Sequence, residues 1–189
     1  MANGYDLAGR TILVTGSSKG IGLAIARLCA ENGARVLVHS TKPEDCANVA
    51  RTIPGSVGLA CNLADPEACV DFCERVAEAC AGRLDVLVHN AGTCPVGTLP
   101  EQGFSEWERV LRVNLGASFL LTQRLLPCLR HPGDKSIVLI SSVVVRLGLG
   151  APLDHGFGLR QFAAVTAVCA LPARCSRKQQ HERRLTGRM

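Results

Sequence analysis

Three glycines near the start of the chain have the type and spacing that most directly indicate chemistry. They follow a short apolar run, Thr11–Thr15, and open an amphipathic segment that extends to Asn32; they are Gly16, Gly20 and Gly22. Such a turn leaves backbone N–H groups at the start of a helix, where the helix dipole favours a phosphate. Glycine suits it because a Cβ would block the tight turn or the approach of phosphates. The stretch predicts a nucleotide-phosphate site, with an ordinary strand-to-helix loop as the alternative.

Further polar residues follow other apolar runs. Asn90, Ala91 and Gly92 come directly after the run Asp85–His89, and Ser142 ends the run Ser136–Ser141. Asn114 lies among apolar residues of a long helical segment, so its amide needs hydrogen-bond partners. Each of these residues alone could serve a turn or a core contact. Their order along the chain favours a shared site.

The predicted elements alternate between strand and helix. The strands are Thr11–Thr15, Arg35–His39, Ser56–Cys61, Asp85–His89 and Ser136–Ser141. The helices are Gly20–Asn32, Pro43–Arg51, Pro66–Ala79, Ser105–Leu129 and Phe157–Leu171, with Asp65 and Ser105 as N-caps and Pro127 near a helix end. Alternation of this kind predicts an α/β fold with a doubly wound parallel sheet of the Rossmann type. Ligands of such sheets bind beyond the carboxyl ends of the strands.

Length and charge favour one domain over residues 1–172, followed by a basic tail. The 189 residues carry a net charge of +5, and all of this excess lies in residues 173–189. The tail has no aromatic residue for base stacking, so we expect a solvated, poorly ordered end rather than a nucleic-acid site. No run approaches the roughly 20 apolar residues of a membrane span, and no signal peptide is visible, so we expect a cytoplasmic protein.

Ten cysteines raise the question of disulfides or a metal site. Without a secretory signal, reduced thiols are the better expectation. Cys69, Cys73, Val76 and Cys80 recur at helical spacing, which indicates small apolar side chains on a core face. The sequence contains no CxxC pair, and we expect no metal site.

Together, Thr15–Gly22, Asn90–Gly92, Asn114 and Ser142 resemble the short-chain dehydrogenase/reductase family in its classical branch, over about residues 7–146. The resemblance implies hydride transfer between a nicotinamide cofactor and a carbonyl or alcohol substrate. It places the adenosine and pyrophosphate near Gly16, Ser18, Lys19, Gly20, Ile21 and Gly22. It places the adenine near Asn62 and Leu63, with Asn62 where the family usually has Asp, and the nicotinamide side near Asn90, Ala91 and Gly92.

The end of the second predicted strand bears on the choice of cofactor. An acid there would accept hydrogen bonds from the ribose hydroxyls and repel a 2′-phosphate. Ser40 occupies that position, Thr41 and Lys42 follow it, and Lys19 lies in the glycine turn. This arrangement favours NADP(H) over NAD(H).

This chain departs from the family's pattern at the residues that move the proton. The resemblance implies that Ser142 polarises the substrate oxygen, that Asn114 supports a proton-relay water, and that a Tyr and a Lys four residues later move the proton. The single Tyr is Tyr5. Phe157 and Gln161 occupy the Tyr and Lys positions in the best register, and neither can exchange a proton. In a second register His155 would act as the acid.

Three functional hypotheses follow. The first is an NADP(H)-dependent oxidoreductase of this family acting on a small carbonyl or alcohol, with catalysis weakened by the missing Tyr and Lys. The second is a catalytically inactive nucleotide-binding or interaction protein. The third is an incomplete chain that folds poorly. Relatives continue into further strands, so we expect a C-terminally truncated or divergent member whose sheet is incomplete on that side and whose dimer helices are partly present, with homo-oligomerisation left open.

Overall fold

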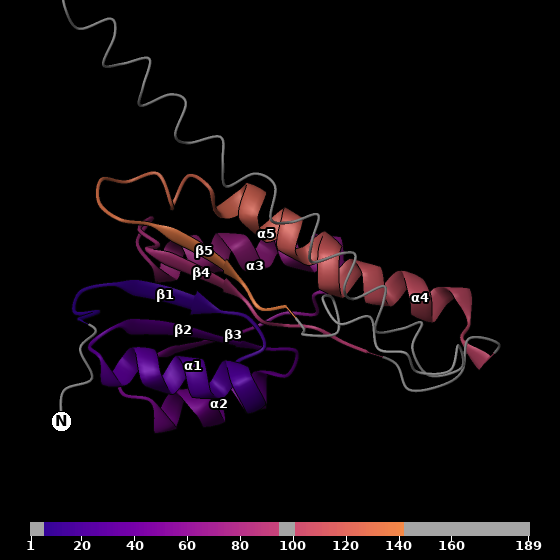
Figure 1. The fold of residues 1–189 in the computed structure, drawn as a ribbon, viewed down its shortest axis with the longest axis horizontal. Coiled ribbons are helices and arrows are strands. Elements are labelled where there is room, and N and C mark those ends of the chain that lie inside the picture. The colour runs from indigo at the N-terminus through magenta and orange to yellow at the C-terminus, as the bar shows by residue number, and fades with distance from the viewer. Residues whose placement is uncertain (1–5, 95–100, 142–189) are drawn as a thin grey trace, which may run out of the picture.

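The computed structural model of this protein describes residues 6–94 and 101–141, and in them five parallel strands form one sheet in the order β3-β2-β1-β4-β5 (Figure 1). The strands are β1 (Thr11–Val14), β2 (Arg35–Ser40), β3 (Val57–Ala60), β4 (Val86–His89) and β5 (Ser136–Leu139). In the register of the central strand β1, Ile12 lies opposite Val36 on one side and Val86 on the other. The chain winds outward from β1 in both directions, which confirms the predicted doubly wound, Rossmann-type sheet.

Helices connect the strands and cover both faces of the sheet. They are α1 (Gly20–Glu31), α2 (Pro43–Thr52), α3 (Pro66–Ala79), α4 (Phe104–Leu111) and α5 (Ala117–Leu125). Figure 1 shows α1 and α2 on one face and α3 with α5 on the other. The predicted boundaries of α1, α2 and α3 agree with these to within a residue or so, and the predicted helix Phe157–Leu171 lies outside the described residues.

The predicted helix Ser105–Leu129, with Ser105 as its N-cap, was wrong at its start, in its middle and at its end. It begins at Phe104 with Gly103 at the N-cap position, where the Gly103 carbonyl accepts from the N–H groups of Glu106 and Trp107. A π-helical turn, η2 (Arg112–Gly116), then separates α4 from α5. The last helix ends at Leu125, two residues before Pro127, because proline cannot continue a helix.

Side chains of the strands alternate between two hydrophobic layers, as the pleat of a strand requires. Leu13, Leu37 and Leu87 point toward α3 and α5, whereas Ile12 and Val36 pack with α1 and α2 on the opposite face. Both layers are closed to solvent. The central strands β1, β2 and β4 are therefore buried on both faces, which is why their sequences are apolar runs with little polar alternation.

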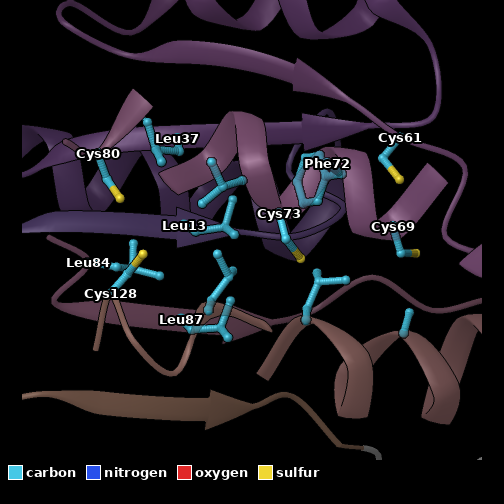
Figure 2. Packing of buried hydrophobic residues seen from close by; sticks show 14 of the residues in the cluster. Leu13, Leu37, Cys61, Cys69, Phe72, Cys73, Cys80, Leu84, Leu87 and Cys128 are labelled. Atoms are coloured by element: carbon cyan, nitrogen blue, oxygen red, sulfur yellow. The ribbon is translucent and has the colours of Figure 1, made fainter. Parts of the chain in front are cut away.

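Cysteines of α3 and of its C-cap fill much of the hydrophobic layer between the sheet and α5, as the helical spacing predicts (Figure 2). Cys69, Cys73 and Cys80 are each at most 4% exposed. Burial raises the pKa of the Cys73 thiol to about 12, so this sulfur is protonated and packs as an apolar group. The predicted N-cap is confirmed, because the Asp65 carboxylate accepts from two backbone N–H groups of the first turn. Within the described ranges, no group of three or more His, Cys, Asp or Glu could hold a metal ion.

A cluster of charges lies at the amino ends of β1, β4 and β5. The Asp85 carboxylate accepts from the backbone N–H of Thr11 at 2.9 Å and lies 3.3 Å from the Arg10 guanidinium and 3.5 Å from the Lys135 ammonium. His131 is 3.8 Å away. Burial alone would raise the pKa of Asp85, but the Thr11 N–H and the three basic side chains outweigh it and lower the pKa. The Asp85 carboxylate therefore links the amino ends of β1, β4 and β5.

We expect Asp85→Asn to lower the free energy of unfolding by about 2 kcal/mol, because it removes the charge from several hydrogen bonds at a nearly buried site. Asp134→Asn is the matched control. The Asp134 carboxylate is fully exposed and lies 3.9 Å from Arg10, so its loss should have little effect on stability. Urea unfolding of both variants measures the difference. Equal effects would show that Asp85 is an ordinary surface carboxylate.

No helix among residues 6–94 and 101–141 is long and apolar enough to cross a membrane. The strand β5 is the last in the order of the described sheet, and it is more exposed than the central strands. Ile137 and Val138 remain 41% and 39% exposed. The carboxyl ends of β1, β2 and β4, by contrast, are buried and meet at one edge of the sheet.

Candidate functional site

The glycine turn between β1 and α1 packs directly against the segment that follows β4. Gly16 has φ +63°, in the left-handed region that favours glycine, and a Cβ there would lie 2.9 Å from the Cα of Ala91. A Cβ on Gly22 would collide with the Asn90 side-chain amide and the Gly16 carbonyl oxygen. Close packing between the glycine turn and the segment after β4 therefore requires glycine at both positions. Both glycines also line a cavity.

Hydrogen bonds between Thr15 and Asn90 lock the two segments together. The Asn90 Nδ2 donates to the carbonyl oxygens of Thr15 at 2.9 Å and Gly16 at 3.1 Å. The Thr15 Oγ1 accepts from the backbone N–H groups of Asn90 and Ala91, both at 3.0 Å. The amide predicted to border a cofactor thus has a structural task that sequence reasoning did not specify, which is to fix the shape of the glycine turn.

His39, at the end of β2, lies beneath the turn and is 3% exposed. Its Nδ1 accepts from the backbone N–H of Gly16 at 2.9 Å, and its Nε2 lies 3.1 Å from the carbonyl oxygen of Cys61. A ring that accepts at one nitrogen and donates at the other is neutral, with its proton on Nε2. Burial lowers the pKa of His39 to about 4, against the opposing effect of the hydrogen bond to Cys61. The imidazole therefore connects the turn to the end of β3.

A cavity of about 620 Å³ opens at the carboxyl ends of the strands, above the glycine turn. Every predicted cofactor-binding residue except Gly20 lines it. Gly20 begins α1 with φ +55° and contributes to the shape of the turn instead. Sequence reasoning missed other lining residues, namely His39, Asp45, Thr93, Arg109 and Val113.

One end of the cavity is lined by the residues after β2. Ser40 is buried, and its hydroxyl donates to the Oδ2 of Asp45 at 3.3 Å. Lys42 and Lys19 also line the cavity, from the start of α2 and from the glycine turn. Asn62 and Leu63, which follow β3, complete this end. Two lysines and one aspartate thus contribute to the lining of the cavity.

At the other end, the π-helical turn η2 holds the segment after Gly92. The Asn114 side chain accepts from the backbone N–H of Thr93 and donates to the Thr93 carbonyl, both at 2.8 Å. The Arg109 guanidinium donates to the Thr93 hydroxyl at 3.2 Å. The amide of Asn114 is thus engaged with the backbone, and its part in a proton relay stays a prediction. Ser142, Phe157 and Gln161 lie outside the described residues, so their predicted roles also remain predictions.

The residues present fit a dinucleotide. The cavity has the size of ordinary small-molecule sites, which span about 300–1,000 Å³. It begins at a helix N-terminus that no side chain caps, because Lys19 occupies the N-cap position of α1 without a side-chain hydrogen bond. Backbone N–H groups at such an end favour phosphates. Two lysines and several amide and hydroxyl groups supply the polar contacts that the rest of a nucleotide needs.

Comparisons with known proteins identify the family and agree with the fold. The sequence pattern of the family described as short chain dehydrogenase matches residues 10–151. The L-fucose dehydrogenase of Bos taurus is 33% identical over 174 residues, which cover 90% of this chain and 63% of that protein. A metagenomic short-chain oxidoreductase solved in complex with NADP is 31% identical, with a TM-score of 0.76 over 93% of this chain and 77% of that one. The Pseudomonas aeruginosa RhlG/NADP active-site complex is 32% identical, with a TM-score of 0.76 over 85% and 64%.

The sheet order and the cavity at its carboxyl edge define a Rossmann-type α/β domain. The chain belongs to the short chain dehydrogenase family. It spans 63%, 50% and 59% of the length of three curated relatives that it matches. The resemblance expected from the sequence is therefore confirmed for the family and the fold.

Proposed function

We propose that this chain binds NADP(H) in the cavity at the carboxyl edge of the sheet, in preference to NAD(H). The observation that carries the proposal is that Lys19 and Lys42 line the cavity and offer cations for a 2′-phosphate, while Ser40 stands in place of an acid at the end of β2. Structures of relatives in complex with NADP support it. Cations beside a phosphate give favourable, salt-dependent interactions.

Each part of the cavity suits one part of the cofactor. The glycine turn and the N-terminus of α1 would hold the pyrophosphate, and Asn62 and Leu63 would border the adenine. Asn90–Gly92 would border the nicotinamide riboside. When bound, the nicotinamide supplies or accepts a hydride. The chain's own contribution is to orient that ring and to exclude water from its buried side.

We expect NADPH to raise the thermal unfolding temperature of the full 189-residue chain more than NADH does. At a ligand concentration near 100 times Kd, binding adds roughly 2.7 kcal/mol to the stability of the folded state. A shift of the melting temperature with NADPH, and a smaller one with NADH, is the expected result of differential scanning fluorimetry. A cooperative melt that neither nucleotide moves would contradict the proposed site.

For the reaction, we propose hydride transfer with a small carbonyl or alcohol, and Ser142 as the group that polarises the substrate oxygen. A second candidate is nucleotide binding without turnover. The observation that favours it is the sequence itself, since Tyr5 is the single Tyr and, in the best register with the family, Phe157 and Gln161 stand at the positions of its Tyr and Lys. Neither side chain can move a proton, and loss of acid–base catalysis commonly costs about 10²–10⁴ in rate.

Restoring the pair separates these candidates. We expect NADPH oxidation with a panel of carbonyl compounds to be slow or undetectable in the natural chain, and to rise about 10²-fold or more in Phe157→Tyr with Gln161→Lys. Each single substitution is the control, because the phenol and the ammonium act together. Turnover in the natural chain at rates ordinary for an enzyme, lost in Ser142→Ala, would establish catalysis without the Tyr and the Lys.

A further inference from the structure

Asp45 is a carboxylate inside the cavity that the proposed NADP(H) preference does not explain. It belongs to the first turn of α2, lines the cavity and is half-buried. The hydroxyl of Ser40 donates to its Oδ2 at 3.3 Å. The cavity wall that would meet the 2′ position of the ribose therefore combines the cations of Lys19 and Lys42 with one anion.

We propose that Asp45 is a specificity-determining residue that opposes the 2′-phosphate and so keeps NAD(H) competitive with NADP(H). This inference rests on the proposed function, because it concerns the same cavity. It predicts a moderate preference between the two cofactors, set by the balance of Asp45 against Lys19 and Lys42. An acid at the end of β2 would normally make this choice, and here that position is Ser40.

Two effects of Asp45 act in the same direction. Its negative charge repels a phosphate dianion but does not repel a neutral 2′-hydroxyl. Its Oδ2 also accepts the hydrogen bond of the Ser40 hydroxyl, so that only the lone pairs of this hydroxyl oxygen are left for a ligand. Lone pairs can accept from a ribose hydroxyl, whereas a phosphate needs donors. Both effects favour the cofactor without the 2′-phosphate.

The neighbouring Glu44 offers a matched control. Both acids lie in the first turn of α2, where a negative charge interacts favourably with the helix dipole. Glu44 is exposed and is not part of the cavity wall. A purely structural role at the helix end would thus be shared by both residues, whereas an effect on cofactor choice belongs to Asp45.

The test measures Kd for NADPH and NADH by titration of the full chain and its variants at 0.1 M and 1 M salt. We expect Asp45→Asn to tighten NADPH binding about tenfold at 0.1 M salt, because it removes the charge and supplies an amide donor, and to change NADH binding less than about twofold. At 1 M salt, where the Debye length falls from about 10 Å to about 3 Å, we expect the gain to shrink severalfold. Glu44→Gln should leave the ratio of the two constants unchanged.

The outcomes distinguish this inference from the proposed function. A natural chain that binds neither nucleotide refutes both. A natural chain that binds NADPH or NADH, with a ratio that Asp45→Asn alters less than twofold, refutes the role of Asp45 alone. An equal change of the ratio in Glu44→Gln also refutes it, since the effect would then come from the helix end. An increase in the preference for NADPH over NADH that occurs in Asp45→Asn alone, and that is smaller at 1 M salt than at 0.1 M salt, establishes the role of Asp45.

Discussion

Gly16→Ala is expected to weaken the binding of NADPH by about 100-fold, or roughly 2.7 kcal/mol. The added methyl would lie 2.9 Å from the Cα of Ala91, which is backbone and cannot swing aside as a flexible side chain could. Either the glycine turn or the segment Asn90–Gly92 must move. Both segments line the cavity, so movement of either one misplaces the groups that would hold the pyrophosphate or the nicotinamide riboside.

Gly55→Ala is the matched control for backbone strain. Gly55 has φ +72°, close to the +63° of Gly16, yet a Cβ there would meet nothing within 4 Å. Both substitutions place alanine in the left-handed region at a cost of about 1–2 kcal/mol, and the collision is confined to Gly16. Titration calorimetry should therefore show normal NADPH binding for folded Gly55→Ala. Equal binding by the two variants would contradict the packing argument.

The local parts of the fold could be predicted from the sequence because their causes are local. Asp65 followed by Pro66 marks the start of α3, and the apolar run Thr11–Thr15 marks a strand that is buried on both faces. The π-helical turn within the long helix could not be predicted. Its residues, Arg112–Gly116, have no sequence signal of a break, and the amide of Asn114 reaches across to Thr93 on another segment.

The same division holds for the candidate site. The glycine turn and Asn90–Gly92 carry a recognisable pattern, and both line the cavity. His39 and Asp45 carry no such pattern. A histidine in an apolar strand indicates a core residue, and an acid after Pro43 indicates the first turn of a helix. His39 is indeed buried, and Asp45 does lie in the first turn of α2. Their positions beside the glycine turn and the cavity depend on how distant segments pack, which a local pattern does not indicate.

Acidification from pH 6.5 to pH 4 is expected to destabilise the protein steeply, because two buried histidines are neutral in the folded state. Burial lowers the pKa values of His39 and His89 to about 4 each, while both return to about 6.5 on unfolding. Between these values the unfolded chain binds protons that the folded chain does not, so stability falls with falling pH. The two neutral histidines therefore make their full contribution to the free energy of unfolding above pH 6.5, and this contribution is lost by pH 4.

Each histidine should contribute a slope of about 1.4 kcal/mol per pH unit within this window, and hence about 3 kcal/mol over the whole of it. Typical domains are stable by about 5–15 kcal/mol, so the two together could unfold the chain before pH 4 is reached. Denaturant unfolding at several pH values between 7.5 and 5 gives the slope directly. The lowered pKa of Asp85 keeps that carboxylate ionised over this range of pH.

His39→Asn tests the share of this pH dependence that comes from the histidine beside the glycine turn. An Asn side chain places its Oδ1 near the position of the imidazole Nδ1, where it can accept from the Gly16 N–H without titrating. The slope should then fall to about half of its natural value, and NADPH binding should become less sensitive to acid. His89, whose Nε2 lies 2.9 Å from the Thr122 hydroxyl, supplies the remaining half. An unchanged slope in His39→Asn would mean that His39 can take up a proton without disturbing the turn. Because its Nδ1 is engaged by Gly16 and its Nε2 faces the Cys61 carbonyl, the folded state has no place for that second proton unless the hydrogen bond to the glycine turn breaks.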